Sequence, residues 1–127
     1  MNLVVDQGNS SAKIALFDAG EMIYFQKYEK FSLDDARSLH DKYNYTKAIR
    51  SSVIGEDEAL SSYLKENTDK WIELTNETPI PLQNLYKTPE TLGRDRIAVC
   101  VGANFLERDR NLLVIDAGTA ITYDVVN

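Results

Sequence analysis

Residues 3–10 read LVVDQGNS, and residues 113–120 read LVIDAGTA. Each segment is an apolar run typical of a buried strand, and it ends in an aspartate, a glycine and small polar residues. A second run rich in β-branched and aromatic residues follows each copy, at residues 12–17 and 121–126, as in a β-hairpin. The two copies begin about 110 residues apart, and a repeat of this kind predicts a duplicated structural unit.

The residue types at the two turns fit a phosphate chain. Backbone N–H groups must point at the phosphates, and Gly8 and Gly118 would let the backbone approach closely at angles that other residues resist. Lys13 could reach a phosphate as a point charge. Hydroxyl and amide side chains near each glycine would add donors without bulk, namely Asn9, Ser10, Ser11, Thr119 and Thr122.

The aspartate at the end of each strand, Asp6 or Asp116, could hold a cation directly or through water. Mg²⁺ usually takes only one or two carboxylates together with phosphate oxygens and water. Two such hairpins facing each other would clamp the phosphates of a nucleotide, which predicts an ATP-using enzyme. The alternative is a plain hairpin turn, because Asp caps turns and Gly supplies positive φ. Two matched copies favour the phosphate interpretation.

Composition and charge exclude several classes of protein. The chain has 127 residues, of which 43% are hydrophobic and 27% charged, as in an ordinary globular domain. The net charge of −6 and the lack of a basic cluster argue against nucleic acid and anionic membranes as partners. No apolar run approaches a membrane span, no signal sequence is evident, and one cysteine cannot form an internal disulfide. We therefore expect a cytoplasmic protein.

The chain has a single histidine, His40. Ser-His-Asp, Cys-His and multi-histidine metal chemistries are thereby disfavoured. Any general base would be a carboxylate. The one cysteine, Cys100, lies in an apolar run and is interpreted as buried packing.

The pattern along the chain predicts an α/β fold with a mixed five-stranded sheet. The first domain is expected at residues 1–110, and residues 111–127 would form the opening hairpin of a second, duplicated domain. Because the rest of that second unit is missing, we expect the chain to be part of a longer protein. The expected strands of the first domain are residues 3–6, 11–17, 22–28, 47–54 and 71–74. The first expected helix runs from its N-cap at Ser32 to about Tyr43, and the second covers residues 56–66. A third helix is expected from Gly93 or Arg94 to about Glu107.

A loop at residues 76–91 carries all three prolines and leads into the sequence GRDR at residues 93–96. Backbone N–H groups at a helix start favour an anionic ligand, and Arg96 can grip a carboxylate with two hydrogen bonds. Asp95, between two arginines, would stay ionised and could accept a proton from a substrate hydroxyl. The alternative is an ordinary helix start, in which Asp95 caps the first turn and both arginines are solvated.

The three motifs together resemble the type III pantothenate kinases of bacteria. Their family pattern is Asp-x-Gly-Asn-Thr/Ser, then Gly-x-Asp-Arg, then Asp-x-Gly-Thr-Ala, found here at residues 6–10, 93–96 and 116–120. Ser10 replaces the commoner threonine and keeps the hydroxyl. These kinases belong to the superfamily of sugar kinases, Hsp70 and actin, so the resemblance implies a ribonuclease-H-like (actin-like ATPase) domain. Family members are about twice as long, and the missing half would supply the rest of the nucleotide cleft and much of a homodimer interface.

The resemblance implies ATP-dependent phosphorylation of pantothenate to 4′-phosphopantothenate, the first step of coenzyme A biosynthesis. It assigns Asp95 as the base on the primary hydroxyl, Asp6 as the residue near Mg²⁺, and Asp116 as the ligand of a monovalent cation, K⁺ or NH₄⁺. The implied ATP contacts are Asp6, Gln7, Gly8, Asn9, Ser10, Ser11, Ala12, Lys13 and Thr119. The implied pantothenate contacts are Tyr86, Gly93, Arg94, Asp95 and Arg96.

Two other functions stay open at this point. The chain could be another small-molecule kinase or ATPase of the same superfamily, although the Gly-Arg-Asp-Arg cluster beside Tyr86 argues for a small acidic substrate. It could also be a non-catalytic regulator related to these kinases. Asp95 and two complete turns speak against a pure binding module, which need not keep a base.

Overall fold

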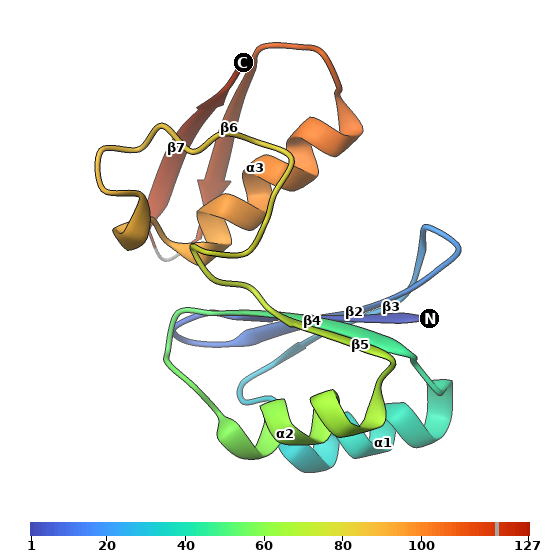
Figure 1. Ribbon diagram of the computed structural model, residues 1–127. Helices are drawn as coiled ribbons and strands as arrows, with labels where there is room; N and C mark the ends of the chain where they lie inside the picture. Colours follow the sequence, from blue (N-terminus) through green and yellow to red (C-terminus); the bar gives the residue numbers. More distant parts are fainter. Residues whose placement is uncertain (119) are drawn as a thin grey trace. The chain divides into compact units, whose positions relative to one another are not determined.

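The computed structural model describes residues 1–118 and 120–127 (Figure 1). The chain forms two compact units, Met1–Leu74 and Thr75–Asn127. The elements of the first unit are β1 (Asn2–Gln7), β2 (Ala12–Asp18), β3 (Glu21–Tyr28), α1 (Leu33–Tyr43), β4 (Lys47–Ser52), α2 (Glu58–Asn67) and β5 (Lys70–Glu73). Those of the second are the 3₁₀ turn η1 (Pro89–Thr91), α3 (Arg94–Leu106), β6 (Leu112–Ala117) and β7 (Ile121–Val126).

The sheet of the first unit has the strand order β3-β2-β1-β4-β5. β1 and β3 run antiparallel to β2, whereas β4 lies parallel to both β1 and β5, so the predicted mixed five-stranded sheet is confirmed. Ala19 and Gly20 join β2 to β3 with φ of 48° and 84°, as a tight two-residue hairpin loop requires. The parallel pairing brings the carboxyl ends of β1 and β4 to one edge, with Gln7 aligned to Ser52.

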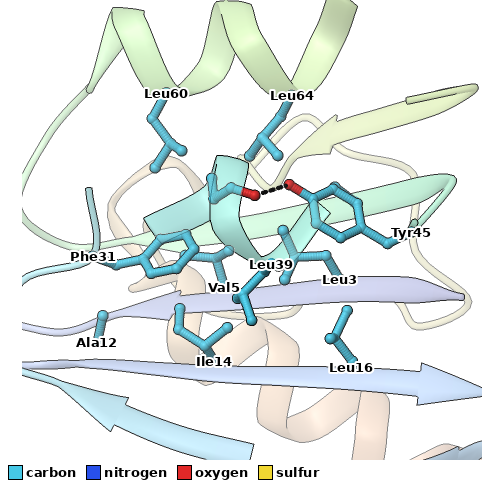
Figure 2. Packing of buried hydrophobic residues seen from close by; sticks show 12 residues of the cluster. Leu3, Val5, Ala12, Ile14, Leu16, Phe31, Leu39, Tyr45, Leu60 and Leu64 are labelled. Atoms are coloured by element: carbon cyan, nitrogen blue, oxygen red, sulfur yellow. Dashed lines mark hydrogen bonds between the residues drawn. The ribbon is translucent and has the colours of Figure 1, made fainter. Parts of the chain in front are cut away.

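Helices α1 and α2 cover one face of this sheet (Figure 1). Side chains alternate along β1, so Leu3 and Val5 are buried on the helix-covered face while Asp6 lies on the other. Figure 2 shows Leu3 and Val5 packed beneath Leu60 and Leu64 of α2. The sequence of β1 thus gives one apolar face for the core and leaves the aspartate on the opposite face.

One buried hydroxyl within this core is hydrogen-bonded. Tyr45 is fully buried, and its hydroxyl donates to the carbonyl oxygen of Ala36 at 2.9 Å (Figure 2). Ser32 caps α1 as predicted, because its Oγ accepts the Asp35 N–H at 3.2 Å while Asp35 accepts the Ser32 N–H at 2.8 Å. These bonds satisfy polar groups that the core would otherwise leave unpaired.

In the second unit, α3 packs against the hairpin of β6 and β7 (Figure 1). The faces of the hairpin differ sharply. The face toward α3 carries half-buried or buried residues, namely Leu112, Val114, Asp116, Thr122, Asp124 and Val126. The opposite face carries exposed apolar residues, namely Leu113, Ile115, Ile121, Tyr123 and Val125.

The predicted domain boundary between residues 110 and 111 stays a prediction. Within this chain, α3 groups with the hairpin rather than with the five-stranded sheet. The predicted helices and strands lie within about two residues of those observed.

Candidate active site

The first predicted phosphate turn is closed by a backbone hydrogen bond. The N–H of Gly8 donates to the carbonyl oxygen of Ser11 at 2.9 Å. The expectation of unusual backbone angles at Gly8 is wrong, because Gly20 and Gly55, and not Gly8, adopt positive φ. Its constraint is space, since an added Cβ would lie 3.2 Å from the Ser11 carbonyl oxygen. Glycine is therefore favoured here by the tightness of the turn.

A backbone hydrogen bond also joins Gly118 to Ala120 at the second predicted turn. The N–H of Gly118 donates to the carbonyl oxygen of Ala120 at 3.1 Å, and an added Cβ at Gly118 would have ordinary contacts. Thr119, the predicted ATP contact of this turn, lies outside the described residues. The closing bond joins residues three positions apart in the first turn and two positions apart in the second, so the repeated phrase gives two hairpins with turns of different span.

Three polar side chains share one row across the sheet of the first unit. Asp6 pairs with Lys13 of β2 and with Ser51 of β4, and cross-strand partners project to the same face. Ser51 is only 8% exposed, and its Oγ has no hydrogen-bond partner in the described part of the chain. A carboxylate, an amine and a hydroxyl in one row suit a Mg²⁺-phosphate group, since hard oxygen ligands and a point charge are what it requires.

A loop after β4 is fixed beside the first turn. The N–H of Val53 donates to the Gln7 carbonyl oxygen at 3.0 Å. Arg50 is almost fully buried, and its guanidinium donates to the Gly55 carbonyl oxygen at 3.1 Å and to Ser61 Oγ at 3.2 Å. The sequence places Arg50 in the middle of an expected strand, but its burial was not predicted.

In the second unit, Asp95 folds back over the start of α3. Its Oδ1 accepts the N–H of Arg96 at 2.9 Å, and an added Cβ at Gly93 would lie only 2.6 Å from that oxygen. The alternative of an ordinary helix start is therefore partly right, because Asp95 does accept a backbone hydrogen bond within the first turn. Its Oδ2 has no hydrogen-bond partner among the described residues and is the oxygen available to a ligand.

Arg96 is held from two sides. Its Nε donates to Asp124 Oδ2 at 3.0 Å and its Nη2 donates to Asp124 Oδ1 at 2.6 Å, while the ring centroid of Tyr86 lies 5.5 Å from the guanidinium carbon. The two hydrogen-bonding side chains are 24% and 18% exposed, so the alternative of a solvated arginine is wrong for Arg96. The hydrogen bonds that Arg96 donates to Asp124 are the main reason that the pKa of Arg96 is raised.

The prediction of a buried Cys100 is only partly right, because this cysteine is half-buried. Burial is the main cause that raises the pKa of its thiol, and the negative charge of Asp124 adds to the effect. The thiol therefore stays protonated at neutral pH, which fits the expectation that it is not a reactive group.

The loop before α3 is ordered by side-chain hydrogen bonds. Asn76 Nδ2 donates to the carbonyl oxygens of Pro89 and Leu92, at 2.7 and 3.0 Å. The N–H of Tyr86 donates to Asn84 Oδ1 at 3.0 Å. The Asn76 bonds span up to sixteen residues and close the loop that carries Tyr86 just before α3 begins.

Asp116 lies on the α3-facing side of its hairpin, paired across the strands with Thr122. A carboxylate beside a hydroxyl suits a hard cation. The described residues contain no group of three or more His, Cys, Asp or Glu placed to hold a metal ion. They also include no helix long and apolar enough to cross a membrane.

The structure thus collects the predicted residues into two sets. Asp6 to Lys13 lie at one edge of the first unit, and Tyr86, Gly93, Asp95, Arg96 and Asp116 lie in the second. A cavity of about 290 Å³ beside α3, lined by Pro81, Val101, Asn104, Phe105, Arg108 and Asp109, contains none of them.

Comparison with known proteins gives consistent results. A family model described as type III pantothenate kinase matches residues 2–127. A protein of that name from Phocaeicola vulgatus is 45% identical over 127 residues, which are 100% of this chain and 52% of the relative. A protein of the same name from Bacteroides fragilis is 42% identical, over 100% of this chain and 52% of the relative. Another from Porphyromonas gingivalis is 41% identical, over 99% of this chain and 51% of the relative. The chain spans about half the length of the curated relatives it matches. Because the family model covers nearly every residue, the chain belongs to the type III pantothenate kinase family.

Proposed function

We propose that the protein transfers the γ-phosphoryl group of ATP to the primary hydroxyl of pantothenate, giving 4′-phosphopantothenate for coenzyme A biosynthesis. The observation that carries this proposal is the start of α3, where the Asp95 carboxylate accepts the backbone N–H of Arg96 and the guanidinium of Arg96 is held by Asp124. A base next to a carboxylate receptor matches a substrate that is both an alcohol and an acid.

The residues of the first turn form the proposed ATP-phosphate site. Gly8, Asn9, Ser10, Ser11 and Ala12 would surround the phosphates, and Lys13 would contribute a point charge from the row that it shares with Asp6. Asp6 would hold Mg²⁺, directly or through water, and the ion when bound would neutralise charge on the phosphates. The buried hydroxyl of Ser51, which has no partner among the residues that the structure describes, supports this assignment, because burying an unsatisfied polar group costs free energy that a ligand can recover.

The proton of the pantothenate hydroxyl would pass to Asp95 Oδ2. As the alcohol oxygen forms its bond to the γ-phosphorus, the bond from that phosphorus to the bridging oxygen breaks and ADP leaves. Arg96, with Tyr86 against its guanidinium, would fix the far end of the substrate through its carboxylate. Most of the acceleration in such a transfer comes from positioning and charge neutralisation.

Several further features belong to the same proposal. The sheet and its covering helices support a ribonuclease-H-like domain at residues 1–110, and residues 111–127 would open a second one. Asp116 would bind K⁺ or NH₄⁺, and Gln7, Thr119 and Arg94 would complete the ligand contacts. A cytoplasmic homodimer is the proposed state of the whole protein.

The direct test is pantothenate-dependent ADP formation from Mg²⁺-ATP by the full-length protein that carries this sequence, in K⁺ and in Na⁺. We expect ADP release that requires pantothenate and is faster in K⁺. ADP release at the same rate without pantothenate would instead indicate another kinase or an ATPase. ATP binding without any turnover would indicate a non-catalytic regulator.

A further inference from the structure

Arg96 makes bonds that its predicted role does not explain. A guanidinium has five N–H donors, and Asp124 takes the one on Nε and one of the two on Nη2. Three donors remain, two on Nη1 and one on Nη2. These lie on a different edge of the same plane, and that edge can still form two parallel bonds to a carboxylate.

The partner of Arg96 comes from a different element and lies far along the chain. Asp124 is on β7 and Arg96 is in the first turn of α3, so a pair 28 residues apart ties the helix start to the hairpin. The paired side chains are largely shielded from water, unlike the exposed pairs Asp34–Arg37 and Glu107–Arg110. A shielded bidentate ion pair holds the guanidinium in one plane. Exposed ion pairs restrain the orientation of their side chains very little.

The ring of Tyr86 contacts the same guanidinium. Its ring centroid lies 5.5 Å from the guanidinium carbon, and the loop that carries it is closed by the bonds from Asn76 to Pro89 and Leu92. One edge of Arg96 is therefore bonded to Asp124, its guanidinium carbon lies over the Tyr86 ring, and the Nη1–Nη2 edge can still take a ligand. Because this arginine is already held in place, it loses little side-chain conformational entropy when it binds an anion.

We propose that Asp124 is a positioning residue, which presents the remaining edge of Arg96 to the carboxylate of pantothenate. This inference rests on the proposed function, because it takes pantothenate as the ligand of Arg96. Removing the charge of Asp124 has two opposed effects. The positive charge of Arg96 becomes less compensated, which favours an anion, but the guanidinium loses its fixed plane. The shielding of the pair makes the second effect larger, so pantothenate binding weakens.

The test measures steady-state kinetics of Asp124→Asn in the full-length protein, with each substrate varied in turn. The KM for pantothenate is expected to rise about tenfold, the KM for ATP to stay within about twofold, and kcat to fall less than the KM rises. Asp124→Glu keeps the charge and should recover part of the loss, and it also serves if the asparagine variant does not fold. Glu107→Gln removes an exposed carboxylate partner of Arg110 in the same unit and is expected to change nothing.

A double-mutant cycle separates positioning from a general structural role. If Asp124 acts through Arg96, then Asp124→Asn adds no further rise in the KM for pantothenate when Arg96 is already alanine. Additive effects, equal losses for both substrates, or an unchanged KM for pantothenate in an active Asp124→Asn enzyme would each overturn the inference. A wild-type protein without pantothenate-dependent turnover would instead refute the proposed function on which it rests.

Discussion

The hairpins β1–β2 and β6–β7 share one sequence phrase but have different surroundings. In the first, Leu3 is fully buried beneath α1 and α2, whereas its counterpart Leu113 in the second is 62% exposed. The other face shows the reverse relation, because the strand-end aspartate Asp116 faces α3 while Asp6 lies on the face away from α1 and α2. The repeat therefore specifies the local hairpin, and the elements packed around each copy decide which face forms a core.

The largest expected difference between the two hairpins is in stability. Leu3→Ala should lower the free energy of unfolding of the first unit by about 2–5 kcal/mol, because it leaves a cavity in a packed core. Leu113→Ala removes the same atoms from an exposed face and should cost less than about 0.5 kcal/mol. Urea unfolding followed by fluorescence of Trp71, the single tryptophan, and by circular dichroism measures both. Equal losses would contradict the contrast in burial.

The two strand-end aspartates should differ in the ligand that they affect. Asp6→Asn should raise the KM for Mg²⁺-ATP about 10–100-fold, because the amide keeps the shape but loses the charge that attracts the ion. Asp116→Asn should mainly alter activation by K⁺. Initial rates across ranges of Mg²⁺-ATP and of K⁺ distinguish the two effects. Identical responses of both variants would mean that the hairpins have not diverged in role.

A smaller effect is expected on the α3 side of the second hairpin. Gly93→Ala would bring a Cβ within 2.6 Å of Asp95 Oδ1, so the carboxylate must rotate away while the helix stays in place. We expect kcat to fall about tenfold with little change in thermal stability. Gly102→Ala is the matched control within α3, since its Cβ meets open space, and it should stabilise the protein by about 0.5–1 kcal/mol without loss of kcat. Unchanged kcat in Gly93→Ala would argue against the observed position of the base.

The smallest effect concerns the response of the first unit to alkaline pH. Burial is the main cause that raises the pKa of Tyr45 and of Tyr28 well above the usual value, and both belong to this unit. A raised pKa in the folded state means that stability is fully present below about pH 10 and is lost as the pH rises further, because the unfolded chain releases its protons first. Urea midpoints by Trp71 fluorescence from pH 7 to 11 should therefore fall above pH 10.

Tyr45→Phe tests the cause of this pH dependence. It should cost about 1 kcal/mol at neutral pH through loss of the bond to Ala36, and it should make the alkaline decline shallower. A decline of unchanged steepness in Tyr45→Phe would show that other groups titrate there.

Local signals in the sequence were sufficient for the elements and for the mixed sheet. The N-cap at Ser32 and the strand at residues 3–6 depend on neighbouring residues only, and both predictions are confirmed. Long-range relations were not predicted. The Arg96–Asp124 pair joins residues 28 positions apart, and only the alternation of Thr122 and Asp124 hinted that this strand has a polar inner face.

The expectation about Gly8 failed for a different reason. A glycine in a turn suggests positive φ, but here glycine is favoured by the 3.2 Å approach of a carbonyl oxygen. Such a close contact depends on the exact path of the turn, which composition does not specify. The assignment of ligands to the individual site residues stays a prediction.

Asp95→Asn is the decisive variant for the proposal that Asp95 is the base in the phosphorylation of pantothenate. The measurement is pantothenate-dependent ADP formation by the full-length variant and wild type, with ATP affinity measured in parallel by calorimetry. Turnover in Asp95→Asn is expected to fall by about 10²–10⁴-fold, while ATP binding changes little. Near-normal turnover in Asp95→Asn would contradict that proposal.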